Sequence, residues 1–117
     1  MQISSRDFGY SELMVISGRV DQSNGDQITR AVETAHEHGR YNLVIDMSQI
    51  EYISSAGMRA LLTAQRNSKH DHGGQLLLTS IPYKVREVLD MAGVTELFMV
   101  FDDLSSALQY AGSLQGS

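Results

Sequence analysis

Short apolar runs alternate along the chain with longer segments in which apolar residues recur every three or four positions. Runs that are short and rich in branched or aromatic residues are typical of β-strands, whereas the longer spacing is typical of amphipathic helices. The first two runs are separated by Gly9, Tyr10 and Ser11, which can form a turn, so the pattern predicts a hairpin at the start. Strands are expected at residues 3–8, 13–18, 41–47, 75–80 and 97–101.

Helices are expected between and after these strands, and a turn is expected at Ser48 and Gln49. The first helix follows residues 21–24, whose polar side chains can cap a helix, and ends at Gly39. The second begins at residues 54–57 and ends at Gly73 and Gly74, the third begins at Pro82 and ends before Gly93, and the last spans residues 104–111. The first helix is expected to bury Ile28, Val32 and Ala35, and the third Val85, Val88 and Leu89. In the second, Met58, Leu61, Leu62 and Gln65 recur at helical spacing.

Alternation of strands and helices predicts an α/β fold with a mixed, mostly parallel β-sheet. The N-terminal edge of that sheet is expected to be antiparallel, with about four helices packed on the sheet. A length of 117 residues suits a single domain, expected over residues 1–117 with a core from about 3 to 112. The final residues, GSLQGS, are expected to fray.

Composition and charge narrow the classes of function. The chain has no cysteine, so disulfides, thiol catalysis and thiolate metal sites are excluded. No apolar stretch suits a membrane span and the N-terminus does not resemble a signal peptide, so a cytoplasmic location without membrane insertion is expected. A net charge of −5 without a basic run disfavours nucleic acid and favours a protein partner.

The segment Ser54-Ser55-Ala56-Gly57 is the strongest candidate for chemistry. The first N–H groups of a helix have no intrahelical partner and carry a partial positive charge, so a serine can cap them and a phosphate is well accommodated there. Spacing alone favours a simple N-cap at Ser54 or Ser55 over a phosphorylation site.

Residues 43–62 resemble the signature region of STAS-domain anti-sigma factor antagonists, in which an element similar to D-S-S-G-L opens a helix. Residues 18–21, Gly-Arg-Val-Asp, resemble the G-x-(L/V)-D element that follows the second strand in that family, and the order of elements fits from about residue 3 to 112. The chain departs from the pattern in having Ser54 where Asp is frequent and Ala56 where Ser is frequent.

The resemblance implies a non-enzymatic switch whose partners are an anti-sigma factor serine kinase and a serine phosphatase. It implies phosphorylation at Ser55, with Ser54 as the second choice, and release of the kinase when the phosphate is added. A docking site without a kinase, in a scaffold subunit of a transport ATPase or a signalling complex, is the alternative. The expected partner-binding residues are Asp21, Ser23, Asn24, Ser54, Ser55, Ala56, Gly57, Met58 and Arg59.

The remaining polar and sulfur-containing residues are given structural roles. Asp21 and Asp46 follow strands but lack a base, nucleophile or phosphate loop, so neither catalysis nor a metal site is expected, and no cofactor is implied. The pairs at residues 36–38 and 70–72, His-x-His, are expected to decorate helix ends. Met58 is expected on the docking helix, and Met91 and Met99 in core gaps. Without a surplus apolar helix face, a monomer is expected.

Overall fold

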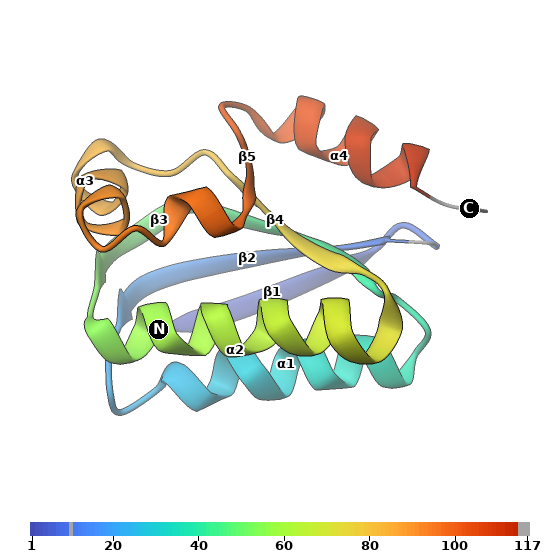
Figure 1. The fold of residues 1–117 in the computed structure, drawn as a ribbon, viewed down its shortest axis with the longest axis horizontal. Coiled ribbons are helices and arrows are strands. Elements are labelled where there is room, and N and C mark those ends of the chain that lie inside the picture. The colour runs from blue at the N-terminus through green and yellow to red at the C-terminus, as the bar shows by residue number, and fades with distance from the viewer. Residues whose placement is uncertain (10, 115–117) are drawn as a thin grey trace.

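The computed structural model describes residues 1–9 and 11–114 and contains one five-stranded sheet in the order β1-β2-β3-β4-β5. Figure 1 shows helices on both faces of this sheet. The strands are β1 (Gln2–Asp7), β2 (Ser11–Val20), β3 (Asn42–Ile53), β4 (Gln75–Thr79) and β5 (Met99–Phe101). The helices are α1 (Gly25–Glu37), α2 (Ser55–His72), α3 (Tyr83–Met91), the 3-10 helix η1 (Thr95–Leu97) and α4 (Leu104–Ser113).

The sheet is antiparallel only at its N-terminal edge. Strands β1 and β2 pair as a hairpin, with Gln2 opposite Ser17 and Asp7 opposite Glu12. Strands β2 to β5 are parallel to one another, which requires the helical crossovers between them. The predicted fold class is therefore confirmed. Tyr10, in the predicted turn, and residues 115–117, in the predicted tail, lie outside the described residues.

Two cores lie on the two faces of the sheet. The larger one joins the sheet to α1, α2 and α3 and includes Ile45, Ile28 and Leu61. The smaller one lies under α4 and contains Leu13, Val44, Leu77, Ala107 and Ala111. In Figure 1, α1 and α2 run side by side below the sheet, and α4 lies above it. Alternate residues of β2, β3 and β4 therefore enter different cores, as the pleat requires.

Strand β3 is longer than predicted, because no turn forms at Ser48 and Gln49. The strand continues to Ile53, and its register against β2 shifts twice. Val15 pairs with Asp46 and Ser17 with Gln49, and further along Gly18 pairs with Ile50 and Arg19 with Tyr52. Each shift adds one residue to β3, which is a β-bulge. At the first bulge, the Asp46 carboxylate accepts a hydrogen bond from the Ser48 N–H at 2.9 Å. The side chain of Asp46 thus gives the backbone N–H of Ser48 a hydrogen-bond partner within the bulge.

Several predictions near the C-terminus were also wrong. Leu97 belongs to η1, so β5 begins at Met99. Met91 is 83% exposed, Met99 is 42% exposed and Val88 is 40% exposed, so none of them fills the core. The inward face of α3 consists of Val85 and Leu89, because a nine-residue helix buries only a narrow stripe.

Helix α2 is anchored by the buried side chain of Gln65. Its Oε1 accepts from the Leu76 N–H at 2.7 Å, and its Nε2 donates to the Leu97 carbonyl at 3.0 Å. These bonds join α2 to β4 and η1, and they satisfy a buried amide. Along residues 1–9 and 11–114, no helix combines the length and apolarity needed to cross a membrane.

Candidate functional site

The junction of β3 and α2 is built around Ser54. The Ser54 N–H donates to the Val20 carbonyl at 2.9 Å, which continues the β2–β3 pairing up to the helix. The backbone of Ser54 is extended, and its Oγ accepts from the Gly57 N–H at 3.2 Å. Ser54 is therefore the N-cap of α2, which settles the choice that spacing left open between the two serines.

Ser55 is the first residue of α2, and its side chain is exposed. Among the described residues, no group hydrogen-bonds to its hydroxyl. The hydroxyl lies at the helix N-terminus, where unpaired N–H groups and the helix dipole favour negative charge. A nucleophilic oxygen that nothing else uses is thus presented to solvent beside a backbone that tolerates a phosphate.

Gly57 has a packing role. It is buried, and a Cβ at this position would come within 2.8 Å of Val20 Cγ1 and 2.9 Å of Ile53 Cγ1. The start of α2 can therefore approach the strand ends only because residue 57 has no side chain. Gly57 is itself buried, and its place among the partner-binding residues stays a prediction.

The loop before α1 is held by its own polar side chains. Asp21 Oδ1 accepts from the Ser23 hydroxyl at 2.6 Å and from the Ser23 N–H at 3.0 Å. These two hydrogen bonds hold the pKa of the Asp21 carboxyl below its ordinary value. Asn24 accepts from the Asp21 N–H at 2.9 Å and donates to the Arg19 carbonyl at 3.0 Å.

This network changes the predicted role of residues 21–24. Asn24 occupies the N-cap position of α1, but its side chain makes no capping bond to the helix. The side chain instead ties the loop to the end of β2, so the predicted cap is wrong. The polar side chains shape a rigid loop rather than the start of a helix.

The segment of residues 21–24 and the junction of β3 and α2 lie together at one end of the α1–α2 pair. A Cβ on Gly25 would lie 3.4 Å from the Ala56 carbonyl oxygen, so the first turns of the two helices are in close contact. Around this contact, Asp21 and Asn24 are half-buried and Ser23 is exposed. Ala56 and Met58 are half-buried, whereas Arg59 is exposed like Ser55. We call this end of the molecule the switch end.

Two exposed residues near the switch end make a contact that the sequence did not indicate. The Arg19 guanidinium lies over the Tyr52 ring, 4.2 Å from its centroid. The two residues pair across β2 and β3 only because of the second bulge, which no local pattern announces. Asp46 lies further back along β3, opposite Thr79, so the two aspartates predicted after strands do not form one site.

The opposite end of the helix pair holds a buried histidine. His36 lies against the His72 ring, with centroids 4.4 Å apart, and His72 stacks on Tyr41 at 4.6 Å. The Ser68 hydroxyl donates to the Ala64 carbonyl at 2.9 Å, so its oxygen accepts from His36 Nε2, also at 2.9 Å. Burial lowers the pKa of His36, and the neighbouring His72 acts in the same direction. His36 is therefore a core residue, which corrects the expectation that it decorates a helix end.

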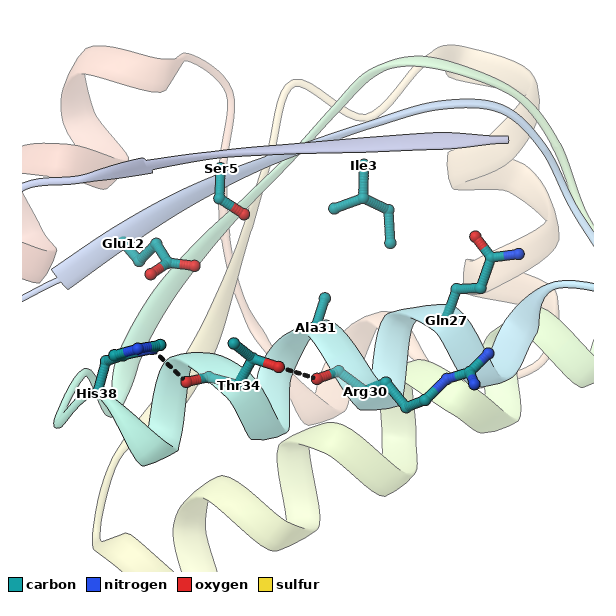
Figure 2. A pocket seen from close by; sticks show the side chains of 8 residues that line it. All are labelled: Ile3, Ser5, Glu12, Gln27, Arg30, Ala31, Thr34 and His38. Carbon is teal, nitrogen blue, oxygen red and sulfur yellow. Dashed lines mark hydrogen bonds between the residues drawn. The ribbon is translucent and has the colours of Figure 1, made fainter.

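A groove of about 550 Å³ runs between β1 and α1, from Gln27 in the first turn of α1 to His38 after its end (Figure 2). Ile3 of β1 and Ala31 of α1 point toward each other across it, and both pack against the main core. Figure 2 draws two hydrogen bonds there, and both are made to backbone carbonyls. The Thr34 hydroxyl donates to the Arg30 carbonyl, and His38 Nδ1 bonds to the Thr34 carbonyl. The polar lining residues do not form a nucleophile–base pair. Across residues 1–9 and 11–114, no three histidine, aspartate or glutamate side chains are grouped to hold a metal ion.

A model of the STAS domain family matches residues 12–107 of the chain. BtrV of Bordetella bronchiseptica, a protein assigned as an anti-sigma factor antagonist, is 28% identical over 92 residues, which cover 79% of this chain and 78% of BtrV. The residues matched by the family model include residues 21–24, the junction of β3 and α2, and the whole of α2.

Solved structures share the fold. An anti-sigma factor antagonist from Thermotoga maritima has a TM-score of 0.84 and 17% identity, covering 94% of both chains. The unphosphorylated form of the antagonist SpoIIAA has a TM-score of 0.79 and 16% identity, covering 97% of this chain and 98% of SpoIIAA. A sulfate transporter family protein from Wolinella succinogenes has a TM-score of 0.80 and 24% identity, covering 93% of this chain and 90% of that one.

Proposed function

The chain belongs to the STAS domain family, and on that premise we propose that it is an anti-sigma factor antagonist controlled by phosphorylation of Ser55. The unphosphorylated protein binds an anti-sigma factor serine kinase, and transfer of phosphate from ATP to Ser55 releases it. A serine phosphatase restores the binding form. The antagonist is thus a regulator and a substrate rather than an enzyme, and it acts as a cytoplasmic monomer.

One observation carries the proposal. Ser54 uses its hydroxyl to cap α2, and Ser55 keeps its own hydroxyl exposed at the centre of the switch end. The two adjacent serines therefore divide two tasks that one residue could not perform together. The similarity to BtrV supports the proposal that the chain is an antagonist, because BtrV is assigned as an anti-sigma factor antagonist.

A phosphate on Ser55 would oppose docking for two physical reasons. It would add a charge of about −1.5 to −2, and that charge would have to be desolvated in any interface that covers the switch end. It would also lie at the same end as the carboxylate of Asp21, because the Ser54 N–H is bonded to the carbonyl of Val20, the residue before Asp21. A carboxylate there is ionised at neutral pH and would repel the phosphate. In the free protein, the N–H groups of α2 would stabilise the same phosphate, so the modified chain would stay folded.

Ser54 is the poorer acceptor of the two. Its oxygen accepts from the Gly57 N–H, and its backbone N–H is bonded to Val20. A kinase would have to free the Ser54 Oγ from the Gly57 N–H, which would remove the cap from the first turn of α2. Ser55 can be reached without that change.

The test is incubation of the protein with ATP, magnesium and each candidate anti-sigma factor kinase, followed by intact-mass spectrometry and peptide mapping. We expect one added phosphate in the wild type and in Ser54→Ala, and none in Ser55→Ala. Binding of the wild type to the kinase, measured without ATP, should be lost after phosphorylation. Phosphate retained in Ser55→Ala, or undiminished binding by the phosphorylated protein, would contradict the proposed switch.

A second candidate is a scaffold subunit of a transport ATPase or signalling complex that docks through the same end without phosphorylation. The shared fold with the Wolinella protein and the replacement of the family's frequent Asp and Ser by Ser54 and Ala56 favour it. Stable binding to such a complex by both wild type and Ser55→Ala, with no serine modified by any kinase, would select this function.

A further inference from the structure

The second bulge of β3 directs Tyr52 to the opposite face of the sheet from α1 and α2. Ile50 pairs with Gly18 and Ile53 with Val20, and both isoleucines enter the main core. Glu51 is the extra residue between them, so Tyr52 pairs with Arg19. Val20 faces the main core, and because successive residues alternate, Arg19 faces the other side together with Tyr52. β-bulges commonly redirect a side chain in this way.

The small core under α4 includes neither Arg19 nor Tyr52. The core under α4 is formed on Leu13, Val44 and Leu77, at the other end of their strands. Strand β4 stops opposite Asp46, so β3 extends beyond it with β2 as its strand partner. The face around Arg19 and Tyr52 is therefore open, with Tyr52 41% exposed and Arg19 also exposed.

The exposed pair is preorganised. The guanidinium lies 4.2 Å from the centroid of the Tyr52 ring, which orients both side chains before any partner arrives. Within the described part of the chain, Arg19 makes no ion pair with a carboxylate, unlike Arg30, Arg40 and Arg86. Its charge is thus available to a group outside this molecule.

The pair is also continuous with the switch end. One residue, Ile53, separates Tyr52 from the cap Ser54. The Arg19 carbonyl accepts a hydrogen bond from the Asn24 side chain, which holds the loop before α1 in place. A partner that covers Ser55 and this loop therefore reaches Arg19 and Tyr52 by passing around the end of the sheet. Tyrosine and arginine are the residue types that most often dominate binding energy in protein interfaces.

We propose that Arg19 and Tyr52 form a second docking point for the kinase that binds the switch end, which rests on the function proposed above. The partner surface is expected to place a carboxylate against the Arg19 guanidinium and an apolar surface against the Tyr52 ring. In a chain with a net charge of −5, Arg19 gives this edge a local positive charge that selects an acidic feature of the partner. Ser55 then acts as the switch, and the pair supplies affinity from the opposite face.

The experiment compares dissociation constants for the candidate kinase, without ATP, by isothermal titration calorimetry. Tyr52→Ala and Arg19→Glu should each weaken binding about 10-fold or more, whereas Tyr52→Phe should bind like the wild type because the ring is retained. Tyr83→Ala, which removes a tyrosine that is 82% exposed on α3, is the matched control and should leave binding unchanged. Circular dichroism and urea unfolding of each variant separate loss of contact from loss of fold, and Arg19→Glu changes an exposed side chain that the fold does not need.

The outcomes distinguish the second docking point from the switch itself. Suppose that the wild type binds the kinase and is phosphorylated at Ser55, but Tyr52→Ala and Arg19→Glu both bind with dissociation constants within about twofold of the wild-type value. This result would overturn the docking point and leave the switch intact. Weakened binding of both variants, together with unchanged binding of Tyr83→Ala, would establish it. Failure of the wild type to bind any anti-sigma factor kinase would overturn the proposed function and the docking point together.

Discussion

The two ends of the α1–α2 pair treat a serine hydroxyl in opposite ways. At the switch end, Ser55 is exposed and its hydroxyl has no hydrogen-bond partner among the described residues. At the far end, Ser68 is fully buried and its hydroxyl donates to Ala64 and accepts from His36. An exposed hydroxyl can rely on water, but a buried one must find partners within the protein. Of these two hydroxyls, the one with spare hydrogen-bonding capacity is the one that meets solvent, where a partner or a kinase can reach it.

Both ends depend on a glycine, and replacing it should give the largest effects on stability. A Cβ on Gly74 would overlap the backbone carbonyl of Tyr41, which cannot move without breaking its bond to the Gln75 N–H. A Cβ on Gly57 would meet the side chains of Val20 and Ile53, which can shift slightly. We expect Gly74→Ala to reduce the free energy of unfolding by about 3 kcal/mol or more, and Gly57→Ala by about 1–3 kcal/mol.

Urea denaturation followed by circular dichroism measures both glycine variants. Gly112 in α4 is the matched control, since a Cβ there meets nothing within 4 Å, and Gly112→Ala should leave stability unchanged or raise it by up to about 1 kcal/mol. Equal losses for Gly57→Ala and Gly112→Ala would show that the switch end tolerates a side chain under α2.

The adjacent serines at the switch end should differ in stability and in modification. Ser54→Ala removes the cap of α2 and should cost about 1 kcal/mol of unfolding free energy. Ser55→Ala removes a hydroxyl with no protein partner and should change stability by less than about 0.5 kcal/mol. Urea unfolding of both variants in the same buffer checks the difference, and a larger loss for Ser55→Ala would mean that its hydroxyl supports the fold.

The smallest expected effect is a pH dependence from the far end. Burial lowers the pKa of His36 in the folded protein, so the unfolded chain binds this proton more tightly. The stability that neutral His36 contributes is complete above its unfolded pKa of about 6.5 and is lost as the pH falls toward the lowered folded value. The groups that face it are His72, which strengthens the effect, and Asp71 and Glu33, which oppose it.

Unfolding free energies at pH 7.5 and pH 5 measure this contribution. His36→Gln should lose less stability over that interval than the wild type does. His38→Gln removes an exposed imidazole next to the same helix end and should keep the wild-type dependence. A steeper loss for His36→Gln than for the wild type would contradict the assignment of the pH effect to His36.

Much of the candidate site followed from local pattern. The order of elements, the start of α2 at two serines and the loop after β2 all depend on side chains close in sequence, and the structure has them where they were expected. The bulges in β3 could not be predicted in this way, because a strand's register depends on its neighbour, and Ser48 and Gln49 are equally suited to a turn. The contact between Arg19 and Tyr52 was missed for the same reason, since only the β2–β3 register brings them together.

The sequence by itself determined the fold class and the family signature, because these are encoded in hydrophobic period and short-range motif. The choice of Ser55 as the acceptor came from the resemblance to that signature and stays a prediction. Tertiary structure decided which serine caps α2, which glycine is buried and which histidine loses contact with water. It also decided that Met91 and Met99 lie on the surface. These outcomes depend on distances between segments that are remote in the chain, and burial is a property of those distances rather than of residue type.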